Sequence, residues 1–416
     1  MEEARASAEA ILAAFATRAV HAGEGHGARP AAPPPTPTVT PIFASNTYLS
    51  TSPEEMDAIL GGERRGYTYA RHDNPTVVAL AQAVAELEGG ARAVAYASGM
   101  AAVFAALAAA PVVQGDRVLL AGDLYGASQT LVQELLAPLG VEPVVADLLD
   151  AAEAERLIER TRPRAILVET ISNPLLRLID GPSLARAAHA AGSLLVVDNT
   201  FATPLLQRPL DWGADIVVHS ATKYLSGHGD ATAGVVLTRN EAVAQRLERQ
   251  AKLTGAILGP FEAWLVHRGL KTLPLRFLRQ CASAAHIAAR LQASGRFARV
   301  WHPLLVDHPD HERAEQLYPA GLCGAVVTLD LGTDKAGVYR FLSALHLVLS
   351  ATTVGDVYSL CLYPAMASHR SLGPEGRRRV GITEGTVRLA VGIEDPDDVA
   401  GDVLAAAAAA AADAPA

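Results

Sequence analysis

The chain has 416 residues, half of them hydrophobic, and a formal net charge of −9. Its acidic balance disfavours nucleic acid as a partner, and no apolar run is long enough to span a bilayer. The first residues lack the pattern of a signal peptide. Cys281, Cys323 and Cys361 are odd in number and far apart, which indicates reduced thiols, no disulfide frame and a cytoplasmic location.

The first 72 residues differ in amino-acid composition from the rest of the chain. The proline-rich stretch "RPAAPPPTPTVTP" at 29–41 excludes a regular helix or a central strand. The stretches that follow it, "PIFASNTYLS" at 41–50 and "GYTYARHDNPT" at 66–76, carry too many aromatic and apolar residues for simple disorder. We therefore expect residues 1–72 to form an extended N-terminal arm.

Residues 73–274 alternate between helical patterns that end at glycine or proline and short runs rich in Val, Ile and Leu. Near-continuous apolar strands separated by helices predict a mostly parallel sheet in a large α/β domain. The expected strands are 93–99, 116–122, 141–147, 165–170, 193–200 and 214–220, and the clearest helices are 76–90, 100–111 and 181–192. Residues 275–416 mix helices with strands at 324–332 and 386–393, which predicts a smaller C-terminal α/β domain.

Polar residues gather just after the predicted strands, at the sheet edge where open parallel sheets bind ligands. No GxGxxG motif or Walker loop accompanies them, so a dinucleotide or nucleoside triphosphate site is not expected, and a GxSxG hydrolase elbow is absent around Ser98. The set comprises Ser98, Gly99, Met100, Asp123, Tyr125, Glu169, Asn173, Asp198, Asn199, His219, Ser220, Thr222 and Lys223.

This set meets the requirements of pyridoxal 5′-phosphate (PLP), which needs an imine-forming lysine, a carboxylate for its ring nitrogen, a phosphate cradle and a flat stacking partner. Lys223 follows an apolar strand and is the candidate lysine. Asp198 can pair with the ring nitrogen, and Tyr125 can stack on the ring. Donors for the phosphate are the helix-start N–H groups and nearby hydroxyls of Gly99, Met100, Ser220 and Thr222.

Six motifs extend this interpretation over nearly the whole chain: "YASGMAA", "ETISNP", "VVDNTFATP", "HSATKYLSGHGD", "RGLKTLPLR" and "VRLAVGIEDPDD". In this order they resemble the cystathionine γ-synthase family of PLP enzymes of cysteine and methionine metabolism. The resemblance implies fold type I, a PLP cofactor, a small amino-acid substrate, no metal, and a homodimer or homotetramer.

The resemblance also implies a role for each matching residue. Lys223 is the Schiff-base lysine and proton carrier, Asp198 the partner of the ring nitrogen, and Tyr125 the stacking group that can protonate the leaving group. Asn173 is expected on the ring hydroxyl, while Arg388 and Thr353 are expected at the substrate. The phosphate cradle is Gly99, Met100, Ser220 and Thr222, completed by Tyr69 and Arg71 of a neighbouring subunit.

Other interpretations stay open for some residues. Asp198 could cap a helix, Tyr125 could lie in the core, and Arg388, Tyr69 and Arg71 could be surface residues. Glu169 is as compatible with a structural as with a catalytic role. A metal site at His302, His308 and His311 is considered, but a solvated loop is the preferred interpretation there.

The implied chemistry is γ-replacement or γ-elimination on an amino acid with a γ-leaving group, most like cystathionine γ-synthase or γ-lyase. Alternatives are an O-acetylhomoserine sulfhydrylase, a methionine γ-lyase-like C–S lyase, a relative that traps the vinylglycine intermediate with another nucleophile, or a catalytically dead PLP-fold binding protein. Ala127 and Lys252 depart from the methionine γ-lyase pattern, and Tyr358 stands where cystathionine enzymes carry a glutamate. These departures predict a changed distal pocket.

Overall fold

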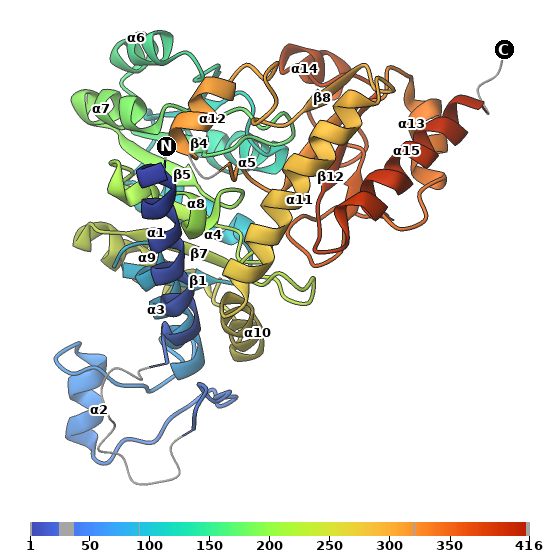
Figure 1. Cartoon of the computed structure of the whole chain (residues 1–416). Helices are drawn as coiled ribbons and strands as arrows, with labels where there is room; N and C mark the ends of the chain where they lie inside the picture. The colour runs from blue at the N-terminus through green and yellow to red at the C-terminus, as the bar shows by residue number, and fades with distance from the viewer. Residues whose placement is uncertain (1, 25–36, 91, 319–320, 413–416) are drawn as a thin grey trace.

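Two β-sheets organise the chain in the computed structural model, which describes residues 2–24, 37–90, 92–318 and 321–412 (Figure 1). The larger sheet has seven strands in the order β1-β7-β6-β5-β4-β2-β3. Only β7 runs antiparallel to its neighbours, so the expectation of a mostly parallel sheet is confirmed. Its strands are β1 (Arg92–Tyr96), β2 (Arg117–Ala121), β3 (Glu142–Ala146), β4 (Ala165–Glu169), β5 (Leu194–Asp198), β6 (Ile216–His219) and β7 (Gly234–Thr238).

The central strands form because their residues are apolar on both faces. Val196, Val197, Val217 and Val218 are fully buried, as expected for parallel strands covered by helices on both sides. Helices of this part of the chain are α3 (Pro75–Leu87), α4 (Gly99–Ala109), α5 (Gly126–Leu131), α6 (Ala151–Thr161), α7 (Gly181–Ala191), α8 (Thr203–Leu206), α9 (Glu241–Thr254) and α10 (Pro260–Leu270), with a π-helical turn at Val132–Leu136 and 3₁₀ turns at Ala137–Leu139 and Pro209–Asp211.

The second sheet has five strands in the order β10-β11-β12-β9-β8 and its own core, which includes Phe341 and Val387. The long helix α11 (Leu273–Ala293) connects the two parts, and the predicted boundary after residue 274 lies in its first turn. The remaining elements are β8 (Arg299–Trp301), α12 (His311–Leu317), β9 (Val326–Asp330), α13 (Lys335–Ser343), β10 (Leu349–Ser350), β11 (Leu360–Leu362), α14 (Gly373–Arg379), β12 (Thr386–Ala390) and α15 (Pro396–Ala412).

The N-terminal segment divides into two parts. Helix α1 (Glu2–His21) lies against the body of the molecule, with Phe15 and Ala19 buried in the large core. By contrast, the segment around α2 (Pro53–Leu60) projects from the body (Figure 1). Most of the proline-rich stretch, residues 29–36, lies outside the described residues. No helix in the described part of the chain is long and apolar enough to cross a membrane.

The expectation of a solvated histidine loop is wrong. His302 is fully buried and His308 nearly so, because each ring nitrogen Nδ1 accepts a backbone N–H two residues along and thereby folds the loop inward. Burial lowers the pKa of His302 to about 3, which keeps the ring neutral. No group of three or more metal-binding side chains is found among the described residues.

Candidate active site

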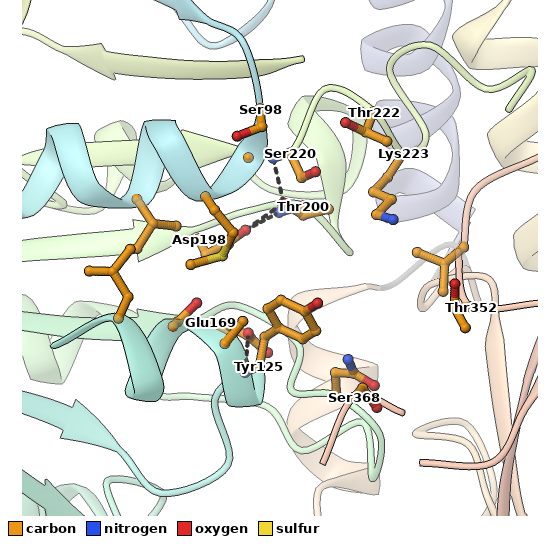
Figure 2. Close-up of a pocket in the computed structure, with 18 of the residues that line it drawn as sticks. Ser98, Tyr125, Glu169, Asp198, Thr200, Ser220, Thr222, Lys223, Thr352 and Ser368 are labelled. Carbon is orange, nitrogen blue, oxygen red and sulfur yellow. Dashed lines mark hydrogen bonds between the residues drawn. The ribbon is translucent and has the colours of Figure 1, made fainter. Parts of the chain in front are cut away.

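The carboxyl ends of β4, β5 and β6 meet at one edge of a cavity of about 960 Å³. Ten of the predicted site residues line this cavity. Figure 2 shows the Tyr125 ring, the Asp198 carboxylate and the Lys223 amine facing the same space from different elements. The ten residues are Gly99, Met100, Tyr125, Asn173, Asp198, Ser220, Thr222, Lys223, Thr353 and Arg388.

Lys223 lies in the turn after β6, and its amine donates a hydrogen bond to Thr353 Oγ1 at 2.7 Å. Burial, with a smaller contribution from the nearby positive charge of Arg388, lowers the pKa of the Lys223 amine to about 8. A substantial share of the amine is therefore neutral near physiological pH, which a nucleophilic or proton-accepting lysine requires.

Asp198 ends β5 in register with Glu169 at the end of β4, so the two acids share one face of the sheet. Burial raises the pKa of both carboxyl groups, and the charge of Asp198 raises that of Glu169 further. Asp198 Oδ1 accepts the N–H and the hydroxyl of Thr200, at 3.0 and 2.5 Å, which opposes the rise of its pKa. Asp198 is therefore the more readily ionised acid of the pair.

Arg388 on β12 reaches the cavity from the second sheet. Its two terminal nitrogens donate to Asn173 Oδ1 at 3.0 Å and to the Thr353 carbonyl at 3.1 Å, while its Nε is buried without a partner in the described structure. Burial lowers the pKa of this guanidinium to about 10, so it remains a cation at neutral pH. A buried cation with a free donor is suited to an incoming carboxylate.

The start of α4 provides an anion-binding edge. Ser98 caps the helix by accepting the Ala101 N–H, and Gly99 and Met100, the first two helical residues, line the cavity. A Cβ on Gly99 would lie 2.6 Å from Ser220 Oγ, so only glycine allows this close approach. Thr222 differs from expectation, because its hydroxyl donates to the Ala233 carbonyl and accepts the Ala233 N–H within its own loop.

Tyr69 and Arg71 do not line this cavity in their own chain. They lie on the projecting arm, where Tyr69 is 40% exposed and the Arg71 guanidinium stacks over its ring at 5.5 Å. Arg71 also donates to the Lys252 carbonyl at 2.5 Å. Within one chain, therefore, the structure does not bring these two residues to the other ten.

Sequence reasoning missed Thr200, which links two parts of the site. Besides donating to Asp198, its hydroxyl accepts the Ser220 N–H at 2.8 Å and so joins the ends of β5 and β6. An Asp followed two residues later by Thr is a pattern that bonds its own backbone, and "DNT" carries that signal. Glu169, left open by the sequence, lines the cavity and accepts the Tyr125 N–H at 2.8 Å.

The family model for Cys/Met metabolism PLP-dependent enzymes matches residues 16–408. The chain belongs to this family. It is 39% identical over 398 residues to an L-methionine gamma-lyase of Pseudomonas putida, covering 94% of this chain and 96% of that one. It is 38% identical to an O-succinylhomoserine sulfhydrylase of Pseudomonas aeruginosa, covering 94% of each chain.

A crystal structure of cystathionine gamma synthase from Xanthomonas oryzae pv. oryzae, in complex with aminoacrylate and cysteine, superimposes with a TM-score of 0.87. It is 36% identical and covers 96% of this chain and 98% of that chain. The enzyme is thus a fold-type-I, PLP-dependent protein of the trans-sulfuration type that acts by γ-replacement or γ-elimination. These relatives catalyse different reactions at similar identity, so overall similarity does not select among them.

The cavity residues fit PLP. A lysine with a lowered pKa, an ionisable acid beside it and a helix start that only glycine can form are the three features that the aldehyde, ring nitrogen and phosphate require. PLP is accordingly the cofactor of this enzyme.

Proposed function

We propose that the enzyme removes a γ-substituent from an L-amino acid and then either replaces it with a nucleophile or releases a 2-oxo acid and ammonia, as cystathionine γ-synthase and γ-lyase do. The observation that carries the proposal is the convergence of Lys223, Asp198 and Arg388 on one cavity from two sheets. When bound there, PLP supplies an electron sink for bonds broken at the substrate's Cα and Cβ.

The roles of the chain's own residues follow from their positions. Arg388 binds the substrate carboxylate, with Asn173 and the Thr353 carbonyl fixing the plane of its guanidinium. The Lys223 amine takes the proton from Cα and returns it, because its lowered pKa lets it accept and release protons near pH 7. Tyr125 stacks on the ring, and its hydroxyl donates a proton to the leaving group.

The phosphate is held by the Gly99 and Met100 N–H groups and the Ser220 hydroxyl, with Thr222 contributing once its hydroxyl turns from Ala233. Asp198, ionised and oriented by Thr200, keeps the ring nitrogen protonated. Glu169 holds the backbone of Tyr125, and burial together with the charge of Asp198 raises the pKa of its carboxyl group.

An O-acyl-homoserine sulfhydrylase is the second candidate, and one observation favours it. Tyr358, which stands where cystathionine enzymes carry a glutamate, is 56% exposed and is not among the lining residues of the cavity. From residues 352–358 only Thr352, Thr353 and Val354 line it, so this segment offers no acid to a distal ammonium group. Glu134 lines the cavity from another element, so the lack of an acid holds for this segment alone, and it favours a homoserine ester and a small thiol over cystathionine.

The arm supports a dimer as the active form. We further propose a pair of dimers as the full assembly and a cytoplasmic location, both of which rest on the sequence and the family resemblance. Leu49 is fully exposed on it, and Phe43, Met56 and Leu60 are exposed as well. A projecting segment with this much exposed apolar surface is suited to packing on a second copy. Packed there, it would deliver Tyr69 and Arg71 to the neighbour's phosphate cradle.

A substrate panel tests the proposal. The holoenzyme is given L-cystathionine, L-methionine and the acetyl and succinyl esters of L-homoserine, with and without an added thiol, and 2-oxobutanoate and thioether products are measured. We expect 2-oxobutanoate or a thioether from at least one γ-substituted substrate, and loss of both activity and the visible cofactor band in Lys223→Ala. A Lys335→Ala control, on the surface of α13, keeps both.

The outcomes separate the candidates. Release of 2-oxobutanoate from cystathionine without thiol indicates a γ-lyase, and product only when thiol is present indicates a replacement enzyme. Turnover confined to homoserine esters indicates the sulfhydrylase. A yellow enzyme that converts none of these substrates, with or without thiol, would refute the proposed γ-chemistry.

A further inference from the structure

A cluster of three polar side chains lies buried beside the cofactor pocket without lining it. Glu88, the residue that ends α3, lies with its Oε1 2.5 Å from His219 Nε2 and accepts a hydrogen bond from Asn199 Nδ2 at 3.0 Å. All three residues are completely buried. Asn199 also donates to the Gln207 carbonyl at 2.9 Å, which ties the cluster to the loop after β5.

The cluster acts on the two strand ends that carry the site. Asn199 directly follows Asp198, and His219 directly precedes Ser220. Asp198 is in register with Val218, and Asn199 extends that ladder by donating its N–H to the Val218 carbonyl at 2.8 Å. Because successive side chains along a strand point to opposite faces, Asn199 and His219 point away from the face that bears Asp198. Glu88 therefore links the ends of β5 and β6 on the face of the sheet opposite to Asp198.

Packing alone does not account for these residues. The neighbouring positions of β5 and β6 are buried valines, and a carboxyl group in such surroundings is costly unless it is paired. Three atoms of the cluster, Glu88 Oε2, Asn199 Oδ1 and His219 Nδ1, have no hydrogen-bond partner in the described structure. An apolar trio of the same volume would avoid both costs, so a polar cluster at this place indicates a function.

We propose that Glu88, acting through His219 and Asn199, is a positioning residue that fixes the separation between Asp198 and the segment Ser220–Lys223, and thereby the seat of the cofactor. Thr200 makes the matching connection on the pocket side, from Asp198 to the Ser220 N–H. The two sets of bonds together clamp the same pair of strand ends from both faces. The inference rests on the proposed roles of Asp198 and Lys223 in holding PLP. It does not depend on which substrate the enzyme uses.

The test compares Glu88→Gln with Asp402→Asn. Both changes remove a charge without changing shape, and Asp402 is a carboxylate that accepts three backbone N–H groups, those of residues 346–348, far from β5 and β6 in the second part of the chain. The measurements are the PLP dissociation constant, the visible circular dichroism of the bound cofactor, and the thermal midpoint. We expect Glu88→Gln to weaken PLP binding about tenfold and to change the dichroism, as the loss of supporting groups around a bound centre does.

Asp402→Asn is expected to lower the thermal midpoint while leaving PLP affinity and dichroism unchanged. If Glu88→Gln behaves like Asp402→Asn, the cluster is a structural support only and the inference is wrong. Should Glu88→Gln fail to fold, His219→Phe, which keeps a ring at this position but removes the Nε2 contact with Glu88, provides the same comparison. A Lys223→Ala protein that keeps its covalent cofactor band would instead overturn the site assignment, so the two failures are distinguishable.

Discussion

Burial of a single amine sets the acid–base chemistry of the pocket at the scale of the residue. Lys223 donates to the Thr353 hydroxyl and lies near the Arg388 cation, and no carboxylate is among its hydrogen-bond partners in the part of the chain that the structure describes. Both burial and that positive charge disfavour the ammonium form, so the pKa falls from the ordinary value for lysine to about 8.

This shift predicts a pH dependence of cofactor capture. Only the neutral amine attacks the PLP aldehyde, and the neutral fraction rises with pH through a pKa of about 8. The rate at which the apoenzyme captures PLP should rise roughly tenfold between about pH 7 and about pH 9 and then level off. Stopped-flow absorbance at the imine band measures it. A rate that continues to rise beyond about pH 10, as for a free lysine, would show that the amine is not buried as described.

Side chains whose chemistry is distinctive could be predicted from the sequence. Lys223 and Asp198 are ionisable residues at the ends of apolar strands, Arg388 was implied by the family resemblance, and all three line the cavity. The local bond between Thr200 and Asp198 is signalled by "DNT", but the contact of Thr200 with Ser220 and the buried contacts of Glu88 depend on which strands are neighbours, and adjacency in a sheet is not visible in a local pattern. The burial of His302 was not expected either, because a loop rich in histidine and proline gives no sign in sequence that its rings turn inward.

The N-terminus of α4 is the element on which phosphate binding depends. Its first residue approaches Ser220 closely, and its last turn lies in the large core. Because the helix is anchored at its far end, a displacement at Gly99 cannot be absorbed by moving the whole helix, and it must appear at the phosphate cradle.

Gly99→Ala is therefore expected to weaken PLP binding by tenfold or more with a small effect on the fold, as measured by equilibrium dialysis and thermal melting. The added Cβ would lie 2.6 Å from Ser220 Oγ and 2.7 Å from Ser220 Cβ. Gly401→Ala in α15 is the matched control, since its Cβ would meet nothing within 4 Å. That control should gain about 0.5–1 kcal/mol of stability, as expected for alanine in a helix interior, and should leave PLP affinity unchanged. Equal affinities in the two variants would refute the close approach at α4.

Secondary-structure elements with a strong sequence pattern could be predicted. Strands that are very short, or that no helix separates from the strand before them, could not. The strands β2, β4, β5 and β6 appear where apolar runs alternate with helices. Strand β7, "GVVLT", was missed because no helix separates it from β6, and the alternation that identified the others does not apply. The two-residue strand β10 and the three-residue β8 and β11 are too short to show a period.

At the scale of the whole molecule, the proposed dimer would make a single chain an incomplete enzyme, because the projecting arm carries two of the predicted site residues. Residues 37–72 carry exposed apolar side chains together with Tyr69 and Arg71, and neither of these two residues reaches the cavity of its own chain. The proposed dimer resolves both observations, since each arm is covered and each phosphate cradle is completed by the other copy.

Subunit mixing tests this arrangement. Lys223→Ala and Arg71→Ala should each be nearly inactive as homo-oligomers. Refolded together in equal amounts, they should recover about a quarter of wild-type activity, because half of the dimers are mixed and one of the two sites in each mixed dimer has both intact residues. The matched control mixes Lys223→Ala with Arg388→Met. Lys223 and Arg388 both belong to the cavity of their own chain. Each site of a mixed dimer therefore still lacks one of these two residues, and no recovery is expected. Full activity of Arg71→Ala alone would contradict the shared site.

The two acids that end β4 and β5 side by side have a thermodynamic consequence for the protein as a whole. Burial raises the pKa of both carboxyl groups, so ionising them costs the native state free energy when no cation lies beside them. A cationic ring bound against Asp198 would lower this free-energy cost and thereby shift the folding equilibrium toward the native state. The holoenzyme is therefore expected to unfold less readily, and to resist proteolysis better, than the apoenzyme.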